Sequence, residues 1–291
     1  MPALLSSRSI AAVLSLGLLL GPVVVPPAAW AQAEAQAEAS AAGVSRVLLI
    51  PEVIAVMRDE GIEYGLSMES ELFPGRGGTD WVRAVDLIYD AATMQRRFEG
   101  VLAAELGGDP ALVAAIEGFF GTDRGQRILT LEVEARRALM DDAVEDAARA
   151  RAEEMTAAND PRMAALRRFA EINDLVESNV MGALNANLAF YRGMQEGGAF
   201  GDDMTEEQML SDVWAQEPDI RSETEDWLYP FLAMAYGPLS DDDLQAYTAF
   251  SETAEGRRMN AVLFAAFDAV FVAISRDLGR AAARQLLGQD I

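Results

Sequence analysis

The sequence predicts an all-α fold: a compact helical domain built from two related halves, each a short helix, a corner and a long helix. No stretch of any length alternates apolar and polar residues as a strand does, whereas apolar residues recur at helical spacing along most of the chain. In addition, residues 115–128 resemble residues 246–259, which lie 131 positions later. The matching positions include Phe119 with Phe250, Gly125 with Gly256 and Arg127 with Arg258. We expect this internal repeat to extend over about residues 110–155 and 241–287.

Residues 1–31 are predicted to be an export signal peptide. Arg8 supplies the positive charge, residues 10–20 are apolar, and the chain then reaches a small-x-small cleavage site that ends at Ala31. A Gly-Pro pair and a Pro-Pro pair interrupt the apolar run, which leaves it shorter than the ~20 residues of a membrane-spanning helix. We therefore expect cleavage after Ala31 and a periplasmic mature protein with no transmembrane segment.

The mature chain is expected to have two parts. Residues 32–44 are rich in Ala, Gln and Glu and offer almost nothing to bury, so we expect a disordered leader there. Residues 45–291 are then expected to form a single helical domain that contains the repeat. That length is sufficient for a domain that is held by packing alone.

The composition excludes several kinds of partner and chemistry. The chain has 47 acidic and 23 basic residues, a net charge of −24, and removal of one arginine with the signal peptide makes it −25. This charge disfavours nucleic acid and anionic membranes as partners; it either suits a basic partner or divalent cations or serves only solvation. The sequence has no Cys, His or Lys, so it lacks disulfides, the commonest transition-metal ligands and most nucleophile–base pairs.

Helix signals in the first half follow one another with short turns between them. The expected helices cover residues 47–60, 81–89, 90–106 and 110–120, with Asp80, Asp90 and Asp109 as N-caps and Pro110 at a first helical position. Gly61 and Gly65 are expected to interrupt the first helix, and residues 71–78 to form a turn-rich loop.

Longer helices are expected in the second half. Their ranges are about residues 123–155, 161–195, 205–215 and 218–236. A short helix capped by Ser240, the second repeat corner and a final helix follow. Thr205 and Gln208 form a capping box, and Pro230 should kink its helix. Residues 261–274 are apolar on every side, which predicts a buried central helix. Asp268 within it should then pair with Arg136 or Arg137 of the other half.

An unusual polar stretch within residues 171–191 is the candidate binding face. It comprises Glu171, Asn173, Asp174, Glu177, Asn179, Asn187 and Tyr191. On one helix, Asn173, Glu177 and Asn187 would lie close to the same face, because 4 and 14 residues are nearly whole turns. Asn is a poor helix former, so its repeated use here points either to a face that binds something or to side chains that satisfy the ends of neighbouring helices.

The repeat also carries a family resemblance. The pattern begins with an apolar residue and Phe. Gly follows six positions after the Phe, and then come Arg or Gln, Arg and an apolar residue that lead into a long helix. It resembles the exported bacterial family catalogued as domain of unknown function 2059, best over residues 244–280 and more loosely over residues 115–149. Residues 74–78, 177–180 and 214–218 are similar to segments of exported members. The resemblance implies an exported all-helical protein, and it implies no activity and no catalytic residue.

Three kinds of function fit these observations. The one we favour is a non-enzymatic exported protein that binds a partner, for example another envelope protein. The second is binding of an apolar small molecule or lipid between helices, by aromatic residues of the final helix and of residues 227–236. The third is a glycan-cleaving enzyme that uses carboxylates alone, with Glu171, Asp174 and Glu177 near Tyr191 as candidates. No cofactor is predicted, because the Gly-rich segments have neither the spacing nor the Lys of a phosphate loop.

Overall fold

Helices make up all the regular structure of residues 27–200 and 204–288, the part of the chain that the computed structural model describes. The elements are α1 (Pro27–Val47), α2 (Ile50–Leu72), α3 (Gly78–Ile88), α4 (Ala91–Leu106), α5 (Pro110–Phe120), α6 (Asp123–Ala138), α7 (Asp142–Ala157), α8 (Pro161–Ile172), α9 (Leu175–Glu196), α10 (Glu206–Trp214), α11 (Glu217–Tyr236), α12 (Asp241–Ser251) and α13 (Ala254–Leu286). The predicted all-α fold is confirmed.

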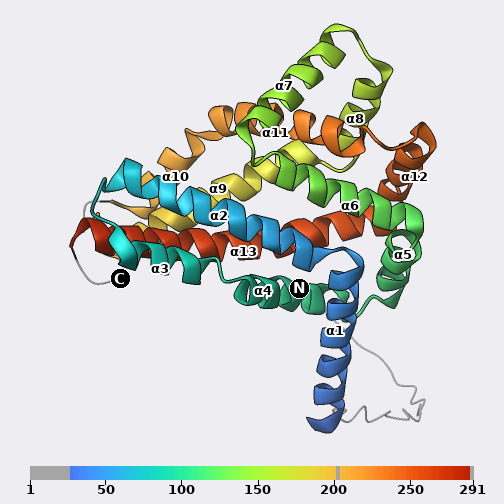
Figure 1. Ribbon diagram of the computed structural model, residues 1–291. Coiled ribbons are helices and arrows are strands. Elements are labelled where there is room, and N and C mark those ends of the chain that lie inside the picture. Colours follow the sequence, from blue (N-terminus) through green and yellow to red (C-terminus); the bar gives the residue numbers. More distant parts are fainter. Residues whose placement is uncertain (1–26, 201–203, 289–291) are drawn as a thin grey trace, which may run out of the picture.

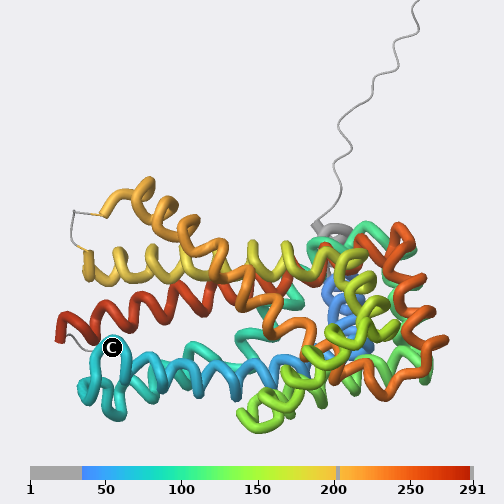
Figure 2. The backbone as a smooth tube through the Cα atoms, turned by 90° about the horizontal axis from the view of Figure 1, so that it is seen from above, coloured from blue at the N-terminus to red at the C-terminus, as the bar shows by residue number. Residues whose placement is uncertain are grey.

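The long helix α13 lies at the centre of this arrangement. It runs beside α9 over most of its length, and α3, α4 and α5 pack against its other sides (Figure 1). Seen from above, α10 lies beyond α9, and α11 crosses over α9 towards α6 and α7 (Figure 2). The buried residues Val262, Ala266, Val270 and Ile274 recur at helical spacing along α13, as expected of a core helix.

Two glycines allow α9 and α13 to lie in close contact. A Cβ atom at Gly193 would collide with the backbone carbonyl oxygen of Arg276, and one at Gly279 would collide with that of Phe190. Small residues at a helix crossing let the two backbones approach each other more closely than larger side chains permit. This contact therefore fixes how α9 and α13 sit relative to each other.

The structure corrects two expectations about the helices of the first half. Gly61 and Gly65 do not interrupt α2; they lie within it, and their missing side chains leave room for Tyr89 and Val85. Asp80 lies in the first turn of α3, whose N-cap is Gly77, because the helix begins earlier than expected. By contrast, Asp90 and Asp109 cap α4 and α5 as predicted.

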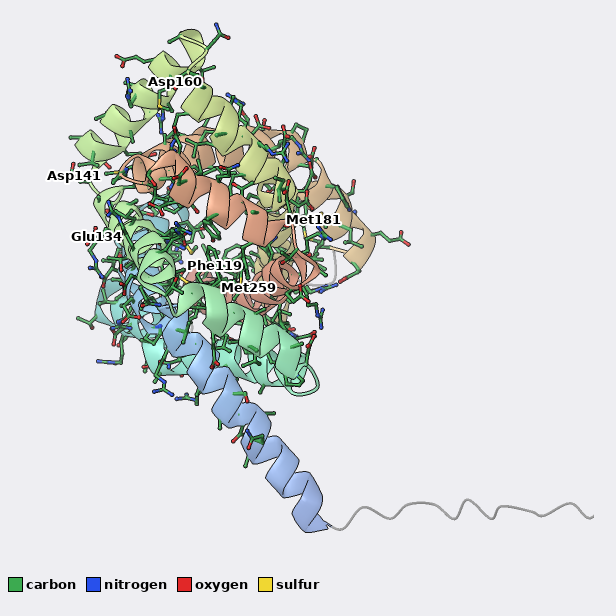
Figure 3. The ribbon with its side chains drawn as sticks, turned by 90° about the vertical axis from the view of Figure 1, so that its right-hand side faces the viewer. Phe119, Glu134, Asp141, Asp160, Met181 and Met259 are labelled. Carbon is green, nitrogen blue, oxygen red and sulfur yellow. The ribbon has the colours of Figure 1, made fainter. Side chains whose placement is uncertain are left out.

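The expected disordered leader is also wrong within the described residues. Residues 27–47 form α1, and Ala41 and Val44 are fully buried. Ala, Glu and Gln are strong helix formers, and α1 packs against α4 and α5. The N-terminal half of α1 projects from the body of the molecule (Figures 1 and 3). Most of the predicted signal peptide lies outside the described residues.

Two helices that the sequence predicts as continuous are each broken in two. The range 123–155 is divided into α6 and α7, and Asp141 accepts hydrogen bonds from the backbone N–H groups of Ala143 and Val144 at the start of α7. The range 161–195 is divided into α8 and α9, because Asp174 adopts the left-handed conformation with φ 51°. Asn and Asp tolerate that conformation better than other residues with a Cβ.

The two corners of the sequence repeat have the same local geometry. Thr122 Oγ1 accepts a hydrogen bond from Gly125 N at 3.1 Å, and Thr253 Oγ1 accepts one from Gly256 N at 2.9 Å. A Cβ atom on either glycine would collide with the preceding helix. The rings of Phe119 and Phe250 stack with centroids 4.6 Å apart, so the corners face each other.

Figure 3 shows Phe119 and Met259 near the centre of the molecule, at the junction of these corners. The similarity does not extend to every position. Arg127 donates to the backbone oxygen of Pro238, whereas Arg258 pairs with Glu105 at 2.5 Å. The helices that follow the corners also differ in length: α6 ends at Ala138, whereas α13 continues past the corresponding position to Leu286. The wider repeat stays a prediction.

None of the described helices is both long and apolar enough to cross a membrane on its own. The segments Ala35–Val47 and Ile50–Leu72 pass such a test only when they are taken together across a bend of 70°.

Candidate functional site

A groove between α9, α11 and α13, at the end of α6, is the best candidate for a functional site. Its volume is about 740 Å³, within the usual range of small-molecule sites. The residues that line it are Arg136, Asp174, Glu177, Ser178, Asn179, Met181, Gly182, Ala183, Asn185, Ala186, Trp227, Phe264, Ala265, Phe267, Asp268 and Phe271.

Large apolar side chains in the groove are left exposed. Met181 is 44% exposed, and Trp227 and Phe271 are each 38% exposed. Phe271 belongs to α13, which was expected to be buried on every face; that expectation is wrong because one side of the helix faces the groove. Contiguous exposed apolar surface of this kind is typical of binding sites.

Small residues give the groove its depth. Gly182, Ala183 and Ala186 of α9 and Ala265 of α13 are among its lining residues. A Cβ atom at Gly182 would have no neighbour within 4 Å, so no packing contact requires glycine there. Glycine within a helix is destabilising by roughly 0.5–1 kcal/mol relative to Ala. The side chain missing at Gly182 therefore leaves open space in the groove at some cost in helix stability.

Asp268 contributes a half-buried carboxylate to the groove. Its Oδ1 accepts a hydrogen bond of 3.0 Å from the side-chain amide of Asn185 on α9. The expected ion pair with Arg136 or Arg137 is wrong for the described residues, because Arg136 instead binds Glu60 of α2 with two hydrogen bonds of 2.8 Å. Asp268 makes no ion pair among residues 35–200 and 204–288.

Two of the other charged groups at the groove wall, Glu177 and Arg136, are neutralised by neighbours. Arg221 binds Glu177 through both of its terminal nitrogens, one of them at 2.9 Å, and the hydrogen bonds from that guanidinium lower the pKa of Glu177. Arg136 is held by Glu60 as described above. Trp227 is fixed by stacking on Phe231, with centroids 5.0 Å apart.

The predicted polar face is divided between the groove and the interior. Asp174, Glu177 and Asn179 line the groove. Asn173 lies in the α8–α9 break and is buried, and its side-chain amide donates to the backbone oxygen of Phe169 at 3.0 Å. Because of this break, Asn173 does not share one helical face with Glu177. The Asn173 side chain therefore satisfies a carbonyl at the end of α8, the helix that it follows.

The remaining members of that face do not line the groove. Asn187 donates to Gln216 at 2.9 Å, which links α9 to the start of α11. Tyr191 stacks on Phe200, with centroids 6.0 Å apart. Glu171 is exposed near the end of α8. The structure therefore does not bring Glu171 and Tyr191 to the groove with the other carboxylates.

Three comparisons of the chain, with protein-family models, with curated proteins and with solved structures, find no match. The resemblance to the exported family of unknown function stays a prediction. The choice among functions therefore depends on the geometry of the chain itself.

A second cavity, of about 660 Å³, lies between α2 and α3, but its charged groups already have partners. Asp86 pairs with Arg58, Arg83 pairs with Asp80, and Glu69 accepts a hydrogen bond from the backbone of Gly77. No aromatic ring lines it. We therefore regard the α9–α11–α13 groove as the better candidate.

An acidic side chain outside the groove has a raised pKa. Tyr236 donates a hydrogen bond of 2.7 Å to the half-buried Glu132 of α6. Burial raises the pKa of Glu132 from 4.5 to about 7, and the hydrogen bonds from Tyr236 and Tyr247 oppose that rise without cancelling it. Tyr247 packs in turn against Phe119 and Phe169, so this carboxyl lies beneath an aromatic cluster rather than in the groove.

Sequence reasoning named both sides of the groove without bringing them together. The polar stretch of α9, the aromatic residues of α13 and Trp227 of α11 were separate candidates for separate functions. Their proximity follows from the parallel packing of α9 and α13, to which no local motif points. Gly182 is the residue that sequence reasoning missed, although a glycine within an otherwise regular helical pattern is itself a signal.

Proposed function

We propose that this chain is an exported, non-enzymatic binding protein that holds a small molecule with an apolar body in the groove between α9, α11 and α13. The observation that carries the proposal is a cavity of about 740 Å³ lined by exposed aromatic and aliphatic side chains. Burial of apolar surface contributes about 25 cal/mol per Å², so a ligand that covers these side chains gains free energy from them.

The periplasmic location belongs to the same proposal. It is supported by the signal-peptide pattern of residues 1–31 and by the absence of Cys, which is compatible with an oxidising compartment. The resemblance to an exported family agrees with this location. Fractionation of cells that express the full chain, with mass measurement of the periplasmic product, should find an N-terminus at Gln32.

The contacts of the candidate carboxylates favour binding over glycan cleavage. Cleavage by carboxylates alone needs one group whose pKa is raised, so that it can donate a proton, beside one that stays ionised. The pKa of Glu177 is lowered by Arg221, and Glu171 lies away from the groove. The raised pKa of Glu132 belongs to a group under the aromatic cluster, which does not line this groove.

The test is a substitution that places a larger side chain in the groove. Leu at position 182 would place its side chain in open space among the groove residues, so Gly182→Leu should lower the affinity for an apolar probe such as octanol at least about ten-fold. Isothermal titration calorimetry of the full chain measures this affinity. The matched control is Gly118→Leu, because Gly118 also lies within a helix with no neighbour near its Cβ position and does not line the groove.

Both substitutions remove a helical glycine, so neither variant should be less stable than the original chain. Equal octanol affinity in the two variants would contradict the proposed site. No detectable binding of octanol to the original chain would contradict the proposed function.

A further inference from the structure

The charged side chains of the groove indicate which charge its ligand carries in addition to an apolar body. Asp268 stands on α13 with Phe264 four residues before it and Phe271 three residues after it, so the three side chains share one face of the helix. Its only described hydrogen bond is with the neutral amide of Asn185. The carboxylate therefore has no ion-pair partner in the described part of the molecule, although the groove around it is largely apolar.

A ligand that fills the groove would remove water from this carboxylate. Burial of an ionised carboxylate without a compensating charge is unfavourable, so a neutral apolar ligand would lose affinity at this point. An anionic ligand would lose more, because it would also be repelled. A cationic group placed beside Asp268 would replace the lost water with an ion pair.

The aromatic rings next to Asp268 favour the same kind of group. The faces of Phe and Trp rings attract organic cations, and quaternary ammonium ligands are bound in this way in aromatic cages. Phe264 and Phe271 form no aromatic pair among the described residues, whereas Phe267 is held against Phe98, with centroids 4.7 Å apart. Two ring faces beside the carboxylate are thus without an aromatic partner.

The other charges of the groove do not oppose a cation. The positive charge of Arg136 is paired with Glu60, and that of Arg221 with Glu177 and Glu217. Asp174, exposed at the end of the groove where α9 begins, adds a second carboxylate with no ion pair among the described residues. The net charge of −24 also raises the local concentration of cations around the molecule.

We propose that the ligand of this groove is a cationic amphiphile, whose ammonium group binds between Asp268 and the rings of Phe264 and Phe271 while its apolar body lies along α9. The proposal rests on the proposed function, since it requires that the groove holds a ligand. It adds the charge of that ligand and the residue that selects it.

The experiment compares three probes that share an apolar chain and differ in charge: octyltrimethylammonium, octanol and octanoate. Titration calorimetry on the full chain should show octyltrimethylammonium binding about ten-fold more tightly than octanol, and octanoate binding most weakly. Asp268→Asn should lower the affinity for the cation about ten-fold and leave that for octanol unchanged or higher. This substitution retains an oxygen that can accept the hydrogen bond from Asn185.

The matched control is Asp242→Asn, which removes the same charge from the exposed first turn of α12. It should leave all three affinities unchanged. Equal affinity of the original chain for the cation and for octanol, or no effect of Asp268→Asn on the cation, would overturn the assignment of the ammonium site. Octanol binding that Gly182→Leu abolishes would still support the groove in that case, whereas absence of binding by all three probes would overturn both proposals.

Discussion

Glu132 provides a direct test of the buried polar contacts, because substitution by Gln mimics its protonated form. The carboxyl accepts a hydrogen bond of 2.7 Å from Tyr236 and lies under the aromatic cluster at the junction of the two sequence-repeat corners. Burial raises its pKa from 4.5 to about 7. Glutamine has nearly the same shape, keeps an oxygen that accepts from Tyr236, and carries no charge at any pH.

The raised pKa determines the sign and size of the effect. Below pH 4.5 the carboxyl is protonated in both the folded and the unfolded chain, so it makes no pH-dependent contribution. As the pH rises from 4.5 to about 7, the unfolded chain loses the proton first and the folded state loses stability relative to it. The resulting loss in the free energy of unfolding is at most about 3 kcal/mol. Each pKa unit equals about 1.4 kcal/mol, and partial solvation of the half-buried carboxyl reduces the effect.

Few other groups interfere in this window. The chain has no His and no Cys, so no other type of side chain ordinarily titrates between about pH 5 and pH 8. Carboxylates held by arginine behave in the opposite sense at lower pH. Hydrogen bonds from Arg276 and Arg280 lower the pKa of Glu196 to about 2, so its contribution is lost only as the pH falls below 4.5.

Urea denaturation at about pH 5 and about pH 8 measures the effect. The free energy of unfolding of the original chain should fall between these values, and that of Glu132→Gln should fall less, by up to about 3 kcal/mol. The control is Glu134→Gln on the exposed side of the same helix, which should keep the original slope. Equal slopes for Glu132→Gln and the original chain would refute the reasoning.

Two further predictions concern the helices that form the groove and the repeat. Gly193→Ala should lower the free energy of unfolding by about 1–3 kcal/mol, because the new Cβ would meet the backbone of α13, whereas Gly182→Ala should raise it by roughly 0.5–1 kcal/mol. Equal effects in urea denaturation would contradict the close α9–α13 contact. Thr253→Ala should lower the free energy of unfolding by roughly 1 kcal/mol, because it removes the hydrogen bond that Gly256 N donates to Thr253 Oγ1. An unchanged melting temperature of this variant would show that the cap contributes nothing.

The helix starts that depend on neighbouring residues could be predicted from the sequence. Asp109 caps α5 with Pro110 behind it, and Thr205 and Gln208 form the predicted capping box of α10. Each of these signals acts over three residues, so it is present in the sequence itself. The same property explains why the all-α fold could be predicted without knowledge of tertiary contacts.

The helix breaks could not be predicted with the same rules. Neither Met140-Asp141 nor Asn173-Asp174 contains Pro or Gly, and the apolar spacing continues across both. The second break depends on Asp174 in the left-handed conformation and on Asn260 of α13, whose side-chain amide donates to the backbone oxygen of Asn173 at 2.6 Å. That last contact joins residues 87 positions apart, so tertiary structure decides where α8 ends.

The unpaired carboxylate of the groove follows from where the structure holds Arg136. The repeat places Arg137 opposite Asp268, and an ion pair of Asp268 with Arg136 or Arg137 would remove the charge from the groove. The structure ends α6 at Ala138 and holds Arg136 against Glu60 of α2 in a bidentate pair, the geometry in which Arg binds a carboxylate most strongly. Asp268 is left with an amide partner in an apolar groove. An unpaired carboxylate in such a place has an energetic cost to the folded protein, and a ligand cation would offset that cost when it binds.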